Sequence, residues 1–538
     1  MEILKSFLGR SSTGQPSGRP PPSRPSKTTM DPQCPRTETV QELARILDEE
    51  TVVHVRGTPA SGKTTLARLL HEYYRQQQRP SVIIYRWPHG VDHSCTNFLV
   101  RKAGDAGYPF ITADTLQTDD IVFIIDESQA SFGDVDLWLG FVKTQSGRGF
   151  GPRVCLFTAY GSPREGPNYG IGTTPVYFGI QQRVSISVSN IEHSPRIGLF
   201  YTRNEFDDVI QRKCSAPWRV LPLHHDAKDY IFGLTNGHPG AVDGVLGMIQ
   251  KAYRSDIKHG DIALVQKHHI IELLNNEDKA FNYLAQAPVQ RSFVNRKNLT
   301  VEAADVLRKV LVNGSISRDL GHEGIRLCYE SGWLHSEALD LEGLDVVCIF
   351  PSRLHEKYVE HYLTASTVPF PIDRYPNIMA LSEEVLRRFS PRNLSSRKQV
   401  GTGAVERHLE ATYQDEFYRS LHDVLGFSTN VSSEWSGDGL GRIDFRITQV
   451  GWGIELLRDG DRLEAHCGRF VGSGIYTPWI ENGWLRDWII IDCRTSMPKP
   501  YNVPDTKLWR AVFKDDFSSV EVLNSNNEVV VSRFPLMS

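Results

Sequence analysis

Residues 51–70 read TVVHVRGTPASGKTTLARLL, and this stretch decides the fold of the first domain. Its segment Gly57–Thr64 fits the pattern GxxxxGK[ST] of nucleotide-binding P-loops. The apolar run Thr51–Val55 precedes the segment and the helical stretch Thr65–Leu70 follows it, as a P-loop requires. Glycines let backbone N–H groups turn inward, and the start of a helix adds partial positive charge. The stretch therefore predicts a loop that binds nucleotide phosphates.

The side chains around this loop predict how it holds ATP and Mg²⁺. We expect Lys63 to reach the β- and γ-phosphates and the Thr64 hydroxyl to complete the magnesium shell. A second apolar run, Ile121–Ile125, ends in Asp126 and Glu127, at the strand end where ligands bind in open α/β sheets. Asp126 is expected to hold Mg²⁺ through water, and Glu127 to orient the attacking water as a catalytic residue. The predicted cofactor-binding residues are Gly57, Thr58, Pro59, Ala60, Ser61, Gly62, Lys63, Thr64, Thr65, Asp126 and His238.

Short apolar runs alternate with longer amphipathic stretches through the first part of the chain. Continuous β-branched runs separated by helix-length segments predict a parallel sheet that is buried on both faces. After the fourth run, Thr158 and Tyr160 are equal candidates for sensing the γ-phosphate. The four runs are Thr51–Val55, Ser81–Tyr85, Ile121–Ile125 and Val154–Phe157.

Composition and periodicity divide the chain into five units and predict a multidomain α/β protein. Residues 10–37 are rich in Pro, Ser and Gly and cannot offset the entropy of ordering. The predicted units are a disordered tail (1–37), a P-loop NTPase domain (38–215), a helical and winged-helix-like lid (216–365), a proline-rich linker (366–400) and a nuclease-like α/β domain (401–538).

Helical spacing of apolar residues places three helices in the second half of the chain. They are expected over Ile257–Leu274, Val301–Leu311 and Val405–Leu425. A glycine turn with Trp333 and the strand Val346–Phe350 follow the second of them and resemble a winged-helix unit.

The segment Gly233–Gly240 reads GLTNGHPG and opens another helix. Glycines that flank the His238–Pro239 step give a rigid turn aimed at a helix start. The segment resembles the GxP motif of STAND-type signalling ATPases, and that resemblance implies that His238 meets the nucleotide phosphates. A purely structural helix cap explains the same residues.

Two carboxylates stand on neighbouring predicted strands of the last domain. Asp444 lies in the alternating run Arg442–Ile447, and Glu455 lies in the run Trp452–Leu457 after a short turn. Paired carboxylates on adjacent strands bind Mg²⁺ or Mn²⁺ and hold a water against a phosphodiester.

The preceding helix supplies a third candidate for the metal. Glu410 falls within about 40° of the apolar face defined by Phe417, whereas Glu416 lies about 100° away. A glutamate on an apolar helix face is costly unless it meets a cation, so we expect Glu410 to be the helix-borne ligand.

Several strings together resemble the crinkler proteins, modular effectors of oomycetes and fungi that pair a STAND-like NTPase with a restriction-endonuclease-fold domain. The strings are GTPASGKTT, FIIDES, LTNGHPGAV, IFPSRLH, YQDEFYR, GRIDFRI, WGIELLRDG and HCGRF, within residues 45–500. The resemblance implies that Asp444 and Glu455 form the acidic pair of a PD-(D/E)xK nuclease, with Glu410 as the third metal ligand.

The resemblance also implies partners and a place of action. It implies double-stranded DNA as substrate, host nuclear proteins or a second copy of the chain as further partners, and action in the nucleus of a host cell. The usual leader motif is absent from residues 1–40, so an endogenous fungal role stays open.

One position departs from the nuclease pattern. The pattern has lysine two residues after the glutamate, where this chain has Leu457. Arg458 follows directly, and Arg462, His466 and Arg469 come later at helical spacing. Arginine stabilises charge but cannot act as a base, so proton transfer would fall to water or His466. The catalytic candidates are therefore Glu127, Asp444, Glu455, Arg458 and His466, and the alternative is a degenerate nuclease domain that only binds.

Overall composition is that of an ordinary soluble globular protein. The 60 Lys and Arg residues against 64 Asp and Glu give a net charge of −4, which neither requires nor excludes nucleic acid. Eight single cysteines predict buried thiols, and no apolar run approaches the length of a membrane helix. We expect no membrane partner.

Overall fold

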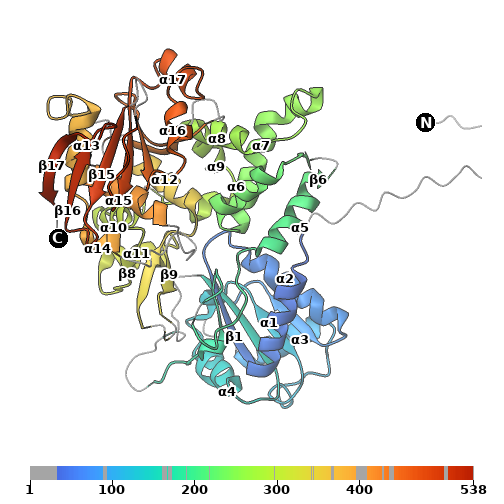
Figure 1. Cartoon of the computed structure of the whole chain (residues 1–538). Helices are drawn as coiled ribbons and strands as arrows, with labels where there is room; N and C mark the ends of the chain where they lie inside the picture. Colours follow the sequence, from blue (N-terminus) through green and yellow to red (C-terminus); the bar gives the residue numbers. More distant parts are fainter. Residues whose placement is uncertain are drawn as a thin grey trace, which may run out of the picture.

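A computed structural model gives the structure of the chain (Figure 1). The expectation of a disordered tail falls mainly on residues outside the described ones. Its last residues are ordered, because the guanidinium of Arg36 is buried against Glu205 and donates to the carbonyl of Leu199 at 2.9 Å. The described residues are 33–88, 94–159, 167, 173–189, 191–216, 219–295, 297–340, 342, 344–364, 369–395, 409–426, 429, 431–435, 441–501 and 507–536.

A five-stranded, wholly parallel sheet forms the first domain and confirms the predicted architecture. One face is covered by apolar residues of α1 and α2 and the other by α3 and η2, so both faces are buried. Its strands in spatial order are β2 (Ser81–Ile84), β3 (Val122–Ile125), β4 (Arg153–Ala159), β1 (Val52–Gly57) and β5 (Arg183–Val184). Its helical segments are α1 (Thr37–Glu50), α2 (Lys63–Gln76), α3 (Cys95–Asp105), η1 (Ser128–Ser131), η2 (Asp136–Val142), α4 (Lys143–Gln145) and η3 (Ile180–Gln182).

A helical unit follows the first sheet. The single helix expected over Ile257–Leu274 is wrong, because α7 ends at His259 and Gly260, with a φ of 87°, forms its left-handed C-cap. The unit contains α5 (Arg203–Cys214), the hairpin β6 (Ser215–Ala216) and β7 (Arg219–Val220), α6 (His225–Thr235), α7 (Pro239–His259), α8 (Lys267–Asn275), α9 (Glu277–Leu284) and η4 (Pro288–Ser292).

A small α+β unit comes next, with the antiparallel strand order β8-β10-β9. Its core is continuous with that of the first sheet, because Trp333 and Phe350 belong to the same buried cluster as Val53 and Leu66. Its elements are α10 (Val301–Asn313), β8 (Ile316–Ser317), α11 (Glu323–Glu330), β9 (His335–Ala338), β10 (Val346–Ile349) and α12 (Arg353–Thr364).

The last domain is built on a seven-stranded mixed sheet in which β13, β14 and β15 are parallel and the other neighbours antiparallel. Figure 1 shows it at the opposite end of the molecule from the first sheet. That this domain has a restriction-endonuclease-like fold stays a prediction. Its strands are β11 (Val431–Trp435), β12 (Ile443–Ile447), β13 (Trp452–Arg458), β14 (Asp487–Arg494), β15 (Leu508–Phe513), β16 (Ser519–Leu523) and β17 (Val529–Pro535), and its helices α15 (Leu409–Leu425), α16 (Leu463–Gly468) and α17 (Thr477–Glu481).

Part of the expected linker belongs to this domain. Residues 378–395 form α13 (Ile378–Arg387) and α14 (Pro391–Ser395), and Leu381 and Val385 are buried in the core beside α15. The proline content of the segment therefore marks helix boundaries rather than a free connection.

All eight cysteines are buried as free thiols. In the part of the chain that the structure describes, no helix is both long and apolar enough to cross a membrane.

Candidate functional site

The predicted phosphate-binding loop joins β1 to α2 and is shaped by two glycines. A Cβ on Gly57 would lie 2.2 Å from Leu199 and 2.5 Å from Ser61, so only glycine fits there. Gly62 has a φ of 91°, which favours glycine, and it forms the N-cap of α2. The loop backbone is thus held in a tight turn immediately before a helix start.

Lys63 is folded over the loop. Its Nζ donates to the carbonyl oxygens of Gly57 at 2.8 Å and Thr58 at 3.0 Å. Burial lowers the pKa of Lys63, while the charges of Glu127 and Asp126 oppose this shift. A cation held over a loop at a helix start suits a polyphosphate.

Thr64 and Asp126 meet as expected for a shared magnesium ion. The Thr64 hydroxyl donates to Asp126 Oδ2 at 2.7 Å, and the Glu127 N–H donates to Oδ1 at 3.0 Å. Burial raises the pKa of Asp126, and these hydrogen bonds oppose the shift. The hydroxyl and carboxylate therefore fit Mg²⁺, which prefers oxygen ligands.

Glu127 stands exposed at the end of β3 with a φ of 50°, a left-handed conformation. Gln129 donates to its carboxylate and accepts from the N–H of Ala159 at 3.1 Å. Gln129 thus ties Glu127 to the tip of β4, and sequence reasoning missed it. The signal was its position two residues after the acidic pair.

The two candidate γ-phosphate sensors have different outcomes. Thr158 is fully buried, and its hydroxyl lies 2.8 Å from Nε2 of His54 on the neighbouring strand β1. That contact directs Thr158 into the sheet. Tyr160 lies outside the described residues.

His238 caps α7, which lies directly on the P-loop. Its Nδ1 accepts from the N–H of Ala241 at 3.1 Å, as the structural-cap interpretation expects. Burial lowers the pKa of His238 to about 3, and the Lys63 charge adds to this effect. The imidazole is therefore neutral, with its proton on Nε2. Next to it, the N–H of Gly240 donates to the carbonyl of Ala60 at 3.1 Å.

Helix α12 connects this region to the last domain. His355 of α12 lies with its ring centroid 5.0 Å from that of His238, and its Nε2 lies 2.9 Å from the Ser292 hydroxyl. Burial holds the pKa of His355 well below its usual range, and the charges of His238 and His335 add to this shift. Through His355, α12 therefore contacts His238, the cap of α7, and α7 in turn lies on the P-loop.

The other face of α12 contacts β11 and α15. Lys357 Nζ donates to the carbonyl of Ser433 at 3.3 Å, and Arg353 donates to the Ser433 hydroxyl at 3.3 Å. Tyr418 donates to Glu360 at 2.7 Å. Burial raises the pKa of Glu360 to about 7. One helix thus touches both the nucleotide side and the C-terminal domain.

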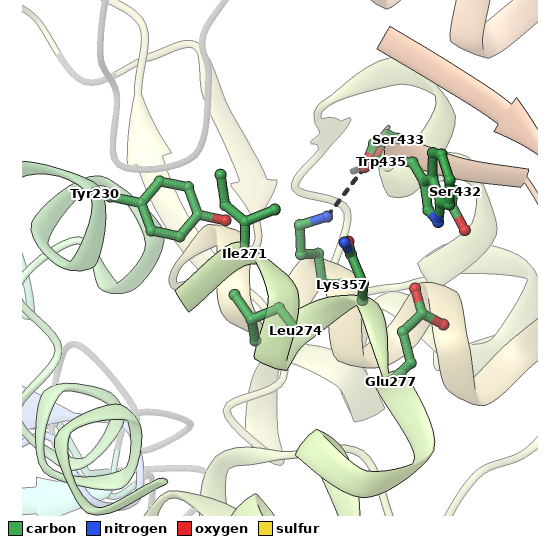
Figure 2. Close-up of a pocket in the computed structure, with 9 residues that line it drawn as sticks. Tyr230, Ile271, Leu274, Glu277, Lys357, Ser432, Ser433 and Trp435 are labelled. Atoms are coloured by element: carbon green, nitrogen blue, oxygen red, sulfur yellow. Dashed lines mark hydrogen bonds between the residues drawn. The ribbon is translucent and has the colours of Figure 1, made fainter. Parts of the chain in front are cut away.

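A small cleft lies at this junction (Figure 2). Figure 2 shows Lys357 from α12 reaching toward Ser433 across it. The lining residues come from α6, α8, α9, α12 and β11 and are Tyr230, Ile271, Leu274, Asn275, Glu277, Lys357, Ser432, Ser433 and Trp435.

Strands β12 and β13 separate at the predicted acidic pair. Their register ends at Phe445 opposite Ile454, although β13 continues to Arg458. Beyond that point the N–H of Leu456 donates to Asp444 Oδ2 at 2.7 Å, so a carboxylate takes the place of a ladder carbonyl. Asp444 Oδ1 also accepts from Gln414 of α15 at 3.1 Å.

Glu455 is only 2 % exposed and is held on one oxygen. Its Oε1 lies 2.6 Å from Arg469 and 2.5 Å from Nδ1 of His466, both supplied by the segment after β13. Its Oε2 is buried and has no hydrogen-bond partner within the described residues. A buried carboxylate oxygen without a donor suits a cation. Of the predicted acidic pair, Glu455 therefore has an oxygen without a donor among the described residues, whereas both oxygens of Asp444 accept hydrogen bonds.

The predicted replacement for lysine is not at this carboxylate. Arg458 contacts Asp459 at 3.1 Å and is half exposed, and Arg462 is exposed at the start of α16. Arg469 supplies the guanidinium at Glu455 instead. Sequence reasoning placed Arg469 in the right helical series but did not select it.

The prediction that Glu410 is the helix-borne metal ligand stays untested. The side chain of Glu410 lies outside the described residues. Glu416, expected to face away from the apolar side, is 1 % exposed. It is satisfied by the N–H of Ser390 at 2.5 Å, Asn393 at 2.8 Å and Arg419 at 2.5 Å, so its role is structural. Among the described residues, no group of three or more His, Cys, Asp or Glu side chains is arranged to hold a metal.

The comparison with protein-family models found no match, and neither did that with curated proteins. Among solved structures, a Walker-type ATPase of Pyrococcus abyssi matches with a TM-score of 0.34 and 13 % identity, over 63 % of this chain and 98 % of that one. The ORC2 protein of Aeropyrum pernix matches at 0.30 and 12 %, over 64 % and 98 %. A STAND protein with a tetratricopeptide repeat sensor from Pyrococcus horikoshii matches at 0.21 and 12 %, over 71 % and 51 %. The functional assignment is therefore built on the geometry of the sites themselves.

Proposed function

We propose that this protein is an ATP-hydrolysing switch that controls a metal-dependent DNA-cutting domain. The observation that carries the first half is the 2.7 Å contact between Thr64 and Asp126 beneath Lys63. A hydroxyl from the first turn of α2 and a carboxylate at the end of β3 meet there, where the P-loop presents its helix start. When bound, Mg²⁺ neutralises phosphate charge, and Glu127 orients the attacking water.

Two variants test the ATPase half. Lys63→Ala removes the loop cation, so we expect ATP affinity to fall by at least tenfold in a fluorescent-nucleotide titration. Glu127→Gln keeps the phosphate cradle intact, so we expect nucleotide to bind normally while phosphate release stops. Equal loss of binding in both variants would show that Glu127 shapes the loop rather than the reaction.

The carboxylates of the last domain support the second half of the proposal. Asp444 and Glu455 lie where two strands separate, and Glu455 keeps Oε2 free of donors among the described residues. Arg469 and His466 stand beside Glu455, and in this proposal they serve as a charge-stabilising group and a proton carrier. A bound Mg²⁺ or Mn²⁺ supplies charge neutralisation and a more acidic water.

Plasmid nicking with Mg²⁺ and Mn²⁺ tests this half. We expect Asp444→Asn and Glu455→Gln each to abolish cleavage while DNA binding survives. Metal binding has its own readout, because a ligand that binds only the folded state raises Tm. The control is Glu464→Gln, because Glu464 is an exposed residue of α16. Without nucleotide, Mn²⁺ should raise the Tm of the unmodified protein and of this control, and should raise the Tm of Glu455→Gln by less.

Contacts of α12 support coupling between the two halves. The P-loop, His238, His355 and α12 form a continuous series that ends at Ser433 on β11, and β11 pairs with the strand that carries Asp444. A nucleotide shifts an equilibrium between two arrangements of the protein only if it binds one arrangement more tightly than the other. Nicking rates that are identical with ATP, ADP and no nucleotide would rule coupling out.

A scaffold function is the second candidate, favoured by Leu457 at the lysine position. In it the ATP switch drives assembly and the last domain only binds DNA or protein, in the nucleus as the crinkler resemblance implies. Nicking that fails with every metal, together with nucleotide-dependent oligomerisation in light scattering, would support this candidate over the first.

A further inference from the structure

A basic and aromatic surface lies on the same side of the last sheet as Glu455. We call it the Trp484 patch, and it consists of Trp435, Arg446, Trp484 and Arg486. The Arg446 guanidinium lies 4.4 Å from the centroid of the Trp435 ring and donates to the carbonyl of Trp484 at 3.0 Å. Trp484 is 40 % exposed, so it presents an indole to solvent beside this cation.

The charge of the patch is not compensated. Within the residues that the structure describes, neither Arg446 nor Arg486 forms an ion pair with a carboxylate. Burial lowers the pKa of Arg446, and the nearby charge of Arg486 adds to this effect. Two neighbouring guanidinium groups held without an anion favour an anionic ligand.

The patch is continuous with the candidate metal centre. Arg469 joins Glu455 to Tyr476, the Tyr476 ring stacks on Trp479 at 4.5 Å, and Trp479 contacts Trp435 at 5.1 Å. Tyr476 and Trp479 are fully buried and form the rigid support, whereas Trp484 is exposed. Arg446 stands two residues after Asp444 on β12. The patch and the carboxylates are therefore held by one packed support.

We propose that the Trp484 patch binds an unpaired stretch of a DNA strand, with a base stacked on Trp484 and phosphates held by Arg446 and Arg486. Stacking on an aromatic ring within a positive surface is how proteins hold single strands without reading sequence. A paired base hides its face in the helix stack, so the patch selects unpaired DNA. The proposal rests on the proposed function in taking DNA as the polymer.

Binding without cleavage tests the proposal independently of nuclease activity. The full chain is titrated in EDTA with a fluorescein-labelled 12-nucleotide oligo-dT and with a blunt duplex of the same length. We expect Trp484→Ala to weaken single-strand binding about tenfold, on the scale of one lost base stack, with little effect on the duplex. Trp484→Phe should restore most of the affinity, and Arg446→Gln should weaken binding and reduce its salt dependence.

The matched control is Phe150→Ala. Phe150 is another exposed ring with an arginine over it, Arg148 at 4.6 Å, but it lies in the first domain. Unchanged single-strand affinity in Trp484→Ala, an equal loss on the duplex, or the same loss in Phe150→Ala would each overturn the proposal. A protein that binds the single strand through Trp484 but cuts nothing would refute the nuclease and leave the patch assigned.

Discussion

Docking of the last domain on α12 should weaken as pH rises, because it buries the carboxyl group of Glu360. Burial raises the pKa of Glu360 from 4.5 to about 7, and the group accepts a hydrogen bond from Tyr418 of α15. The docked state therefore holds its proton more tightly than the undocked state. Its stabilising effect is complete below pH 4.5 and is lost as pH rises to about 7.

The magnitude follows from the shift. Each pKa unit corresponds to about 1.4 kcal/mol, so the full loss is about 3 kcal/mol. Between pH 5.5 and 8 the loss is about 2 kcal/mol, or roughly thirtyfold in the ratio of docked to undocked molecules. Glu360→Gln removes the titration and keeps an acceptor for Tyr418, so its docking should be nearly independent of pH.

Hydrogen–deuterium exchange of α12 and α15 measures this opening, after correction for the intrinsic effect of pH. In the unmodified protein, protection of these helices should fall from pH 5.5 to 8, while Glu360→Gln stays flat. Glu383→Gln is the matched control, because Glu383 is a solvent-facing residue of α13 paired with Arg387. Equal pH dependence in the unmodified protein and Glu360→Gln would refute the reasoning.

Three further predictions follow from named contacts. Gly240→Val should loosen the packing of α7 on the P-loop and speed nucleotide release in stopped flow, because a Cβ at Gly240 would lie 2.7 Å from the Cβ of Ala60. The control Gly233→Ala has open space around it and should leave the release rate unchanged. Asp126→Asn should lower ATP affinity at least tenfold with Mg²⁺ but little in EDTA, as titrations in both buffers would show. Arg469→Met should reduce the nicking rate by about 10²-fold, the scale of one lost electrostatic donor, while Arg458→Met should not.

Local patterns were enough to predict the first domain. Its strands are continuous β-branched runs, and its loop is a contiguous motif, so neighbouring residues carry the information. The contact of Thr64 with Asp126 follows from the same topology, because the P-loop that follows β1 and the carboxylate that follows β3 lie at the same edge of a parallel sheet. What the motif cannot give is the position of α7 over Ala60, which depends on packing between distant segments.

The last domain was harder to predict, because several of its buried polar residues pair with residues from other segments. A helical wheel placed Glu416 off the apolar face, yet Asn393 and Arg419 satisfy it, so burial is tolerated. The prolines in residues 366–400 led to the prediction of a linker, although Leu381 and Val385 already stood at helical spacing. Arg469 reaches Glu455 only because the backbone turns at Asp459 and Arg462, both with positive φ.

In the proposed nuclease, the departure at Leu457 changes which segments supply the catalytic groups more than which kinds of groups are present. Leu457 is 2 % exposed and packs with Cys467 and Trp488, so a lysine there would bury its charge in an apolar cluster. The chain instead brings Arg469 and His466 to Glu455 Oε1, and Oε2 has no donor among the described residues. Arginine cannot accept a proton, so in the proposed reaction that step belongs to water or His466. Because the Arg469 guanidinium already sits on one oxygen of Glu455, a metal in the proposed reaction would bind against its repulsion, and the metal's affinity for Oε2 would decide between the two proposed functions.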